Sequence, residues 1–174
     1  VRLHQIKPED FSHGKTRNLG VSLTSGEFVV MMTHDALPAS DKWLFELVSA
    51  VEQSDCIAGS FGRHLAYGHH GPLITRDLTM HFDGFLNMPV VSKLEDKERY
   101  DRDVGYRQVL HFFSDNNACL RRSVWEKIPY PEVDFAEDQL WAQQIIEAGY
   151  SKAYSDKAVV YHSHRFGPVE LFRR

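Results

Sequence analysis

Two aspartates occupy positions where a carboxylate can do chemistry. Asp35 follows the apolar run Phe28–Met32, whose pattern predicts a strand buried on both faces of a parallel sheet. Open α/β sheets bind ligands beyond the carboxyl ends of their strands, so an aspartate there can hold a metal ion or a metal-bound phosphate. The alternative is structural, because aspartate also commonly begins a turn, here ahead of Pro38.

The second carboxylate, Asp138, lies in a segment with helical spacing. It shares one predicted face with Trp141, Ala142 and Ile145. A carboxylate on the apolar side of a helix costs free energy unless it is paired or lines a cavity. The alternative is that Glu137 and Asp138 only stabilise the positive end of the helix dipole. That alternative explains why acids occur here, but not why one of them faces inward.

Histidines are the unusual feature of the composition, with ten among 174 residues. His162 and His164 directly follow a strand predicted over residues 158–161, and the alternation of an extended chain places both on the same side. They could complete a metal site with a carboxylate at another strand end. A satisfied core or surface role is the alternative for each, and the pattern supports either role equally.

The elements that must position these residues alternate between helix and strand. Helices are predicted over 13–24, 40–51, 123–128 and 135–148, and strands over 28–32, 56–60 and 158–161. This order predicts an α/β fold with a mostly parallel sheet flanked by helices. Residues 62–113 lack a clear period and are predicted to form a long loop, which in a compact domain is usually a lid or a binding segment.

Composition narrows the class of protein. Residues 1–174 suffice for one domain, with 43% hydrophobic and 25% charged residues, and a net charge of -4 gives no reason to expect a nucleic-acid surface. Cys56 and Cys119 are expected to be reduced thiols of a cytoplasmic protein. No apolar run has transmembrane length. Basic and aromatic residues in 165–174 could approach the inner face of a membrane.

Four short stretches occur in order along the chain. They are FSHGKTRNLG at 11–20, THDALP at 33–38, SDNNA at 114–118 followed by Arg121 and Arg122, and FAEDQLW at 135–141 followed by HSH at 162–164. Together they resemble the inverting family-2 glycosyltransferases of the GT-A fold, and most closely the bacterial rhamnosyltransferase-like branch. The resemblance covers nearly the whole chain and implies a GT-A-like sheet.

The chain departs from this family in two places. Thr33 stands where the metal motif usually carries an acid, which leaves Asp35 as its carboxylate ligand. The family's opening strand, with the acidic residue that contacts the nucleotide base, would lie before Val1. The fold is therefore expected to be incomplete at its N-terminus.

The resemblance implies roles for individual residues. It makes Asp138 the general base, with Glu137 holding the acceptor or a neighbouring side chain. Asp35, His162 and His164 would bind Mn²⁺ or Mg²⁺, which neutralises charge on a leaving diphosphate. The remaining residues divide between the donor side, with Arg17, Asn18 and His34, and the acceptor side, with Ser114, Asn116, Asn117 and Trp141.

The expected function is therefore sugar transfer, with inversion, from a nucleotide-diphosphate donor to a hydroxyl of a glycan or lipid-linked acceptor. Rhamnose is the sugar that the branch suggests. One alternative is a metal-dependent hydrolase in which zinc is bound by Asp35, His69, His70, His162 and His164. Another is a glycan-binding remnant without catalytic activity.

Overall fold

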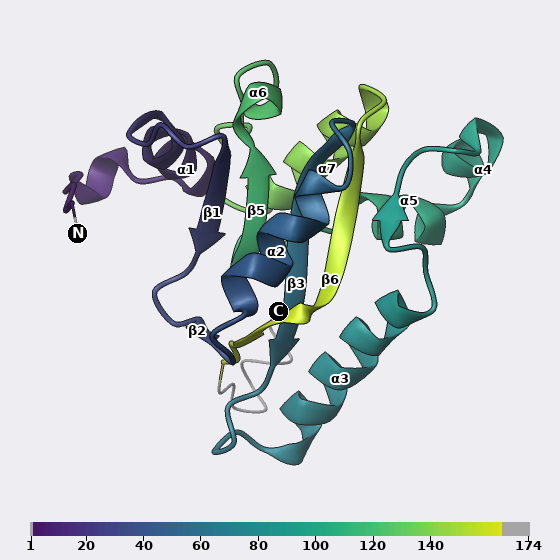
Figure 1. The fold of residues 1–174 in the computed structure, drawn as a ribbon, viewed down its shortest axis with the longest axis horizontal. Helices are drawn as coiled ribbons and strands as arrows, with labels where there is room; N and C mark the ends of the chain where they lie inside the picture. The colour runs from purple at the N-terminus through teal and green to yellow at the C-terminus, as the bar shows by residue number, and fades with distance from the viewer. Residues whose placement is uncertain (1, 165–174) are drawn as a thin grey trace.

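The computed structural model describes residues 2–164, and within this range the strands form one mixed sheet (Figure 1). The sheet order is β1-β5-β3-β6-β2, and β4 also pairs with β6. The strands are β1 (Phe28–Met32), β2 (Leu37–Pro38), β3 (Ile57–Leu65), β4 (Val91–Ser92), β5 (Asn117–Arg121) and β6 (Ser151–Tyr161). The helices are α1 (His13–Ser22), α2 (Trp43–Glu52), α3 (Pro72–Leu86), α4 (Lys97–Arg102), α5 (Val104–His111), α6 (Arg122–Trp125) and α7 (Glu137–Glu147), preceded by a 3₁₀ turn at Pro8–Asp10.

The predicted α/β class with flanking helices is confirmed, but the prediction of a mostly parallel sheet is wrong. Among the described strands, only β3 and β6 pair in parallel. β1 and β3 each pair antiparallel with β5, so β1, β3 and β6 share one direction. Helix α2 lies between β1 and β3 in the chain, as expected for two strands with the same direction. Helices also precede and follow β5, yet this strand runs the opposite way between β1 and β3, so the order of elements does not fix the direction of each strand.

The first strand has the predicted bounds but not the predicted burial. β1 lies at one edge of the described sheet, only Val29 is buried, and Met32 is 45% exposed. An unbroken apolar run therefore did not indicate burial on both faces in this case.

The predicted loop at 62–113 is also wrong, because most of this segment is helical. Helix α3 turns Phe82 into the core, and Leu78 and Phe85 pack beside it. The same helix exposes Leu73 and Met80, so its apolar residues do not form a single stripe. Helix α4 explains the charge run that follows, with ion pairs between residues four apart, Lys97 with Asp101 and Glu98 with Arg102.

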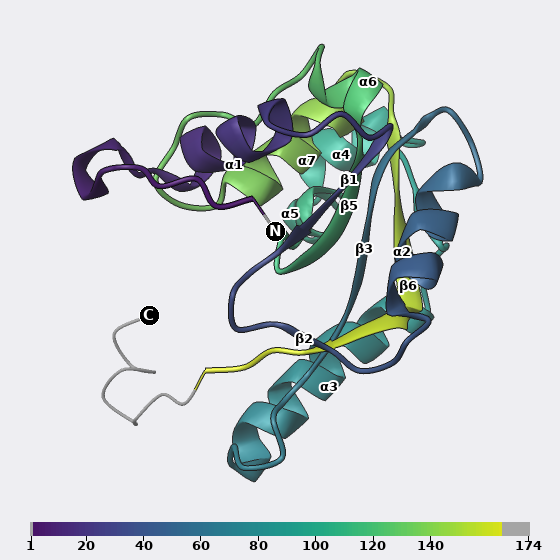
Figure 2. The same ribbon diagram turned by 60° about the vertical axis from the view of Figure 1, so that its left-hand side comes forward.

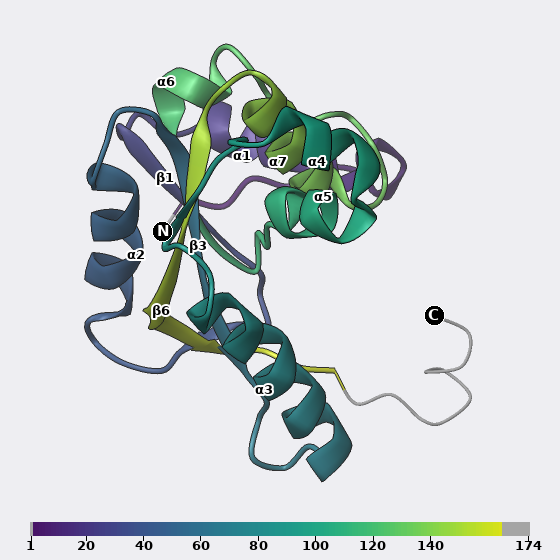
Figure 3. The same ribbon diagram turned by 90° about the vertical axis from the view of Figure 1, so that its right-hand side faces the viewer.

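Helices cover both faces of the sheet. α2 lies on one face, where Leu47 and Val51 pack against Ile57, whereas α1, α5 and α7 lie on the other (Figures 2 and 3). The larger core on that second face includes Phe61 and the fully buried Trp141. Among the described residues, no helix is both long and apolar enough to cross a bilayer. Segment 165–174, predicted to approach a membrane, lies outside the described residues.

Close packing at Gly62 fixes how β3 meets β6. The register between these strands shifts after Gly62. A Cβ atom added there would overlap the carbonyl oxygen of Ala158 and the side-chain amide of Asn117. The strand ends that carry His64 and His162 therefore depend on a glycine at this position.

We expect Gly62→Ala to lower the free energy of unfolding by about 3 kcal/mol, because the added methyl group forces the strands apart. The matched control is Gly68→Ala, where no heavy atom lies within 4 Å of the added Cβ. Urea unfolding of both variants measures the difference. Equal stability of the two variants would contradict the packing argument.

Candidate active site

Asp35, His162 and His164 form a cluster at one end of the sheet. The Asp35 Oδ2 atom lies 3.5 Å from His162 Nε2 and 3.8 Å from His164 Nδ1. The three ligand atoms all lie within 4.8 Å of one another, close enough to bind a single ion. The two histidines follow β6, and the pairing of β2 with β6 brings the turn that holds Asp35 beside them.

Asp35 lies in a turn, as one of the two interpretations of the sequence expects. The Ala36 amide donates to the Thr33 carbonyl, so the residue does lie in a turn. The Tyr67 hydroxyl donates to the backbone carbonyl of Asp35 at 2.8 Å, which anchors that turn. Its side chain meanwhile faces the histidines.

The charge states of the cluster suit metal binding. Burial raises the pKa of Asp35. The neighbouring Thr33 hydroxyl and the imidazole of His162 lower this pKa and outweigh burial, so the net shift is downward. Burial lowers the pKa of His162, and the carboxylate of Asp35 offsets this only in part. An ionised carboxylate and a neutral imidazole are the forms that bind a divalent cation, so the donor set fits such an ion.

The five-ligand zinc site of the hydrolase alternative is only partly assembled. Among residues 2–164, the cluster contains three of those ligands, Asp35, His162 and His164. His70 Nδ1 lies 2.5 Å from the Ser163 hydroxyl, and His69 stacks on Tyr67. His34, predicted on the donor side, is exposed in the turn and lies close enough to lower the pKa of His162.

Asp138 lies in the first turn of α7. Its carboxylate accepts hydrogen bonds from the backbone amides of Gln139, at 2.8 Å, and of Asp115, at 3.3 Å. Burial raises the pKa of Asp138, and the adjacent charge of Glu137 raises it further. A raised pKa makes the carboxylate a stronger proton acceptor.

Glu137 and Arg17 belong to a buried charge cluster that the sequence did not reveal. Arg17 Nε donates to Glu137 Oε1 at 2.6 Å and lies 3.0 Å from Asp115 Oδ2. The Tyr130 hydroxyl donates to the other oxygen of Asp115 at 2.7 Å. Burial raises the pKa of the Asp115 carboxyl to about 7, against the opposing charge of Arg17. Arg17, predicted to contact the donor, instead joins two carboxylates.

Three other predicted contact residues have structural roles. The amide of Asn18 exchanges hydrogen bonds with the backbone of Tyr130 and accepts one from Trp125. Asn117 is fully buried, donates to the Ala158 carbonyl and accepts from Trp43. Trp141 has no exposed surface, so its predicted contact with an acceptor is wrong. A motif specifies residue types, and it does not specify which of them face the core.

Ser114 and Asn116 remain in a position to meet a ligand. Both line a hollow of about 420 Å³ that also reaches His162 and His164. His64, for which the sequence predicted no role, also lines this hollow. Burial lowers the pKa of His64 to about 3, so its ring is neutral. The Asn116 side-chain amide lies 3.4 Å from His162 Nδ1.

Residues 115 and 116 connect the two halves of the site. The backbone amide of Asp115 binds the carboxylate of Asp138, and the next side chain, Asn116, contacts His162 of the metal cluster. Adjacent residues have Cα atoms about 3.8 Å apart, so a short chain of contacts links Asp138 to the cluster of Asp35, His162 and His164.

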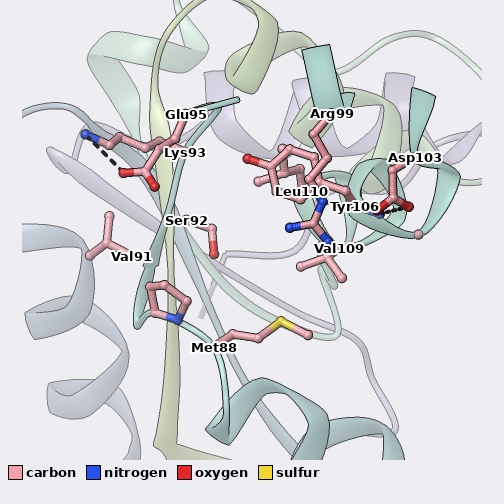
Figure 4. Close-up of a pocket in the computed structure, with 12 residues that line it drawn as sticks. Met88, Val91, Ser92, Lys93, Glu95, Arg99, Asp103, Tyr106, Val109 and Leu110 are labelled. Atoms are coloured by element: carbon pink, nitrogen blue, oxygen red, sulfur yellow. Dashed lines mark hydrogen bonds and ion pairs between the residues drawn. The ribbon is translucent and has the colours of Figure 1, made fainter. Parts of the chain in front are cut away.

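A second hollow, of about 370 Å³, lies between β4 and helices α4 and α5 (Figure 4). It is lined by Met88, Tyr106 and Val109, with ion pairs at its rim between Lys93 and Glu95 and between Arg99 and Asp103. None of the predicted site residues lies there.

Two bacterial proteins are similar to the chain over most of its length. It is 33% identical to the O-antigen chain rhamnosyltransferase RfbN of Salmonella typhimurium over 177 residues, covering all of this chain and 53% of the relative. It is 34% identical to the O-antigen chain rhamnosyltransferase WbaN of Salmonella anatum, covering 97% of this chain and 51% of the relative. The resemblance to rhamnosyltransferase-like glycosyltransferases is confirmed. The chain spans about half the length of these relatives, and no family model matches it.

Solved glycosyltransferase structures share the fold at low sequence identity. The mannosyltransferase PcManGT from Pyrobaculum calidifontis, in complex with GDP-Man and Mn²⁺, aligns with a TM-score of 0.57 at 15% identity, over 93% of this chain and 39% of that one. S. aureus TarS 1-349, in complex with UDP-GlcNAc, aligns with a TM-score of 0.59 at 17% identity, over 95% and 43%. These similarities confirm the fold as that of known glycosyltransferases.

The buried Asp115 carboxyl should make stability depend on pH. Its pKa in the folded chain, about 7, lies above the ordinary value of 3.8. The stability that its protonated form contributes is therefore present below pH 4 and is lost as the pH rises through 7. Asp115→Asn removes this titration. We expect the wild type to lose up to about 3 kcal/mol more stability than the variant between pH 5 and pH 8.

Urea unfolding at the two pH values measures this difference, and Asp134→Asn, at an exposed position, is the control. Parallel pH profiles for the wild type and Asp115→Asn would show that the carboxyl does not titrate in this range.

Proposed function

We propose that the chain is the catalytic part of a metal-dependent glycosyltransferase. It would move a sugar, rhamnose in the first instance, from a nucleotide-diphosphate donor to a hydroxyl of a glycan or lipid-linked acceptor, with inversion. The observation that carries the proposal is the connection of the Asp35, His162 and His164 cluster to Asp138 through residues 115 and 116. The names of the two relatives, and the GDP-Man and Mn²⁺ bound by one structural neighbour, support it.

Asp35, His162 and His164 would hold the cation, Mn²⁺ or Mg²⁺. When bound, such an ion neutralises the charge that grows on the leaving diphosphate. With the ion, the carboxylate and the two imidazoles would hold the diphosphate at the end of β6. Ser114 and Asn116 line the hollow beside this cluster, where a sugar could be bound.

Asp138 would act as the general base. Its carboxylate accepts the proton of the acceptor hydroxyl as the oxygen attacks the anomeric carbon, and its raised pKa favours that transfer. Attack from the face opposite the leaving diphosphate inverts the configuration of that carbon. The Asp115 amide fixes the orientation of the base.

Glu137 is better described as a positioning residue. It is only 4% exposed and is held by Arg17, so it orients the start of α7. This matches the second of its two expected roles, that of holding a neighbouring side chain.

Asp138→Asn should lower kcat by at least about 100-fold, because the amide cannot accept the proton. Donor affinity should stay within about twofold, since the amide replaces the carboxylate without a change of size. Steady-state transfer assays and calorimetric titration with the nucleotide sugar measure the two quantities. Wild-type turnover in this variant would refute the assignment of the base.

Removal of one imidazole tests the metal site. We expect Mn²⁺ to bind weakly to the protein alone and at least about tenfold more tightly with a nucleoside diphosphate, since the diphosphate adds oxygen ligands. His164→Ala should abolish this increase in Mn²⁺ affinity, whereas His13→Ala, at an exposed site remote in sequence, should leave it unchanged.

Calorimetric titration with Mn²⁺, with and without the diphosphate, provides the measurement. Tight stoichiometric binding of Zn²⁺ without any nucleotide would instead favour the hydrolase.

A further inference from the structure

The residues of the metal cluster come from two separate segments of the chain. Asp35 lies in the turn before β2, whereas His162 and His164 follow β6. The strand that joins the two segments, β2, is two residues long, and one of the two is Pro38, which has no amide hydrogen to donate to β6. This short pairing alone gives the turn of Asp35 little support.

The segment at the end of β3 contacts both parts of the cluster. The backbone amide of His162 donates to the Leu65 carbonyl at 2.9 Å. The backbone amide of Tyr67 donates to the Ser163 hydroxyl at 3.0 Å, and the Tyr67 hydroxyl donates to the Asp35 carbonyl at 2.8 Å. Tyr67 therefore binds the segment after β6 through its backbone and the turn of Asp35 through its side chain.

Neighbouring rings hold the side chain of Tyr67 in place. Its ring stacks on that of Tyr161, with 6.1 Å between the centroids and 27° between the planes, and on that of His69 at 5.6 Å. These contacts involve the ring and not the hydroxyl, so a phenylalanine at position 67 should keep the same orientation. The packing directs the hydroxyl at the turn without help from a bound ion.

A site with few protein ligands depends on how well each ligand is held. Ligands that must be ordered on binding reduce the affinity, because part of the binding free energy is used to order them. Asp35 lies outside the strand ladders, so its position depends on contacts such as that of the Tyr67 hydroxyl. In metal sites, removal of a partner that orients a ligand typically weakens metal binding by about 10–100-fold.

We propose that Tyr67 is a positioning residue of the metal site, which holds Asp35 against the segment of His162 and His164. This inference rests on the proposed metal-dependent transfer and adds a residue that acts through the ligands. A purely structural role of the hydroxyl would lower the free energy of unfolding and leave the metal affinity of the folded protein unchanged. The two roles are therefore separable by measurement.

Tyr67→Phe removes the hydroxyl and retains the ring. We expect this variant to bind Mn²⁺ about tenfold more weakly than the wild type when a nucleoside diphosphate is present, because Asp35 is less well held. The matched control is Tyr161→Phe, which removes the hydroxyl of the other tyrosine in the same stack and should change the affinity by less than about twofold.

The variants are made in the native polypeptide, as its gene encodes it. Calorimetric titration with Mn²⁺, in the presence of whichever of UDP, GDP and dTDP binds the wild type, measures the affinity, and urea unfolding of the same samples measures the stability. Transfer assays give a second readout. The Mn²⁺ concentration for half-maximal activity should rise about tenfold in Tyr67→Phe, whereas kcat at saturating Mn²⁺ should stay within about twofold.

Ser163→Ala tests the other contact of Tyr67 and provides the result if Tyr67→Phe does not fold. It removes the acceptor of the Tyr67 backbone amide, so it should also weaken Mn²⁺ binding. In the double variant the loss should be smaller than the product of the two single losses, because both contacts act through one residue.

An unchanged Mn²⁺ affinity in Tyr67→Phe, or an equal loss of affinity in Tyr161→Phe, would overturn the positioning role and leave the proposed transfer intact. If none of the three nucleotides increased the Mn²⁺ affinity of the wild type, metal-dependent transfer itself would be refuted, and the positioning role with it.

Discussion

The ion pairs of Arg17 join the segments that build the site. Its Nε lies 2.6 Å from Glu137 and 3.0 Å from Asp115, so α1, the segment before β5 and the start of α7 meet at one cation. Two buried carboxylates this close repel each other and are costly to remove from water unless they share a positive charge. Asp138, the proposed base, lies beside this cluster and accepts a hydrogen bond from the backbone amide of Asp115.

Helix α1 reaches this position through close contacts along its length. A Cβ atom on Gly14 would overlap the carbonyl of Pro131, so a glycine is required for α1 to approach that loop. Asn18, one turn later, binds the backbone of Tyr130, whose hydroxyl donates to Asp115. The helix that resembled a donor-binding element thus supports the segments that hold Tyr130 and Asp115.

The sequence was informative where a local rule determines geometry. Positions at strand ends, and alternation in the case of the two histidines, indicated that Asp35, His162 and His164 could lie together, although the pairing of β2 with β6 that joins them was not predicted. The sequence was misleading where the burial and the partners of a side chain depend on its tertiary neighbours. Asn117 and Trp141 belong to matching motifs yet are fully buried, and Arg17, the ion-pair partner of Asp115, lies almost 100 residues away in α1. No local pattern contains that information.

The irregular pattern of residues 62–113 has a physical cause in helix α3. A helix packed on a core shows one apolar stripe, but α3 also lines two hollows, one of which reaches His162 and His164. Phe82 faces the core, while His81, next to it, stands at the wall shared by two hollows. A helix with one face against the core and another along a hollow mixes rings, polar groups and aliphatic residues, so its hydrophobic period is blurred. The weakest structural signal in the sequence therefore comes from a segment that packs against the core on one side only.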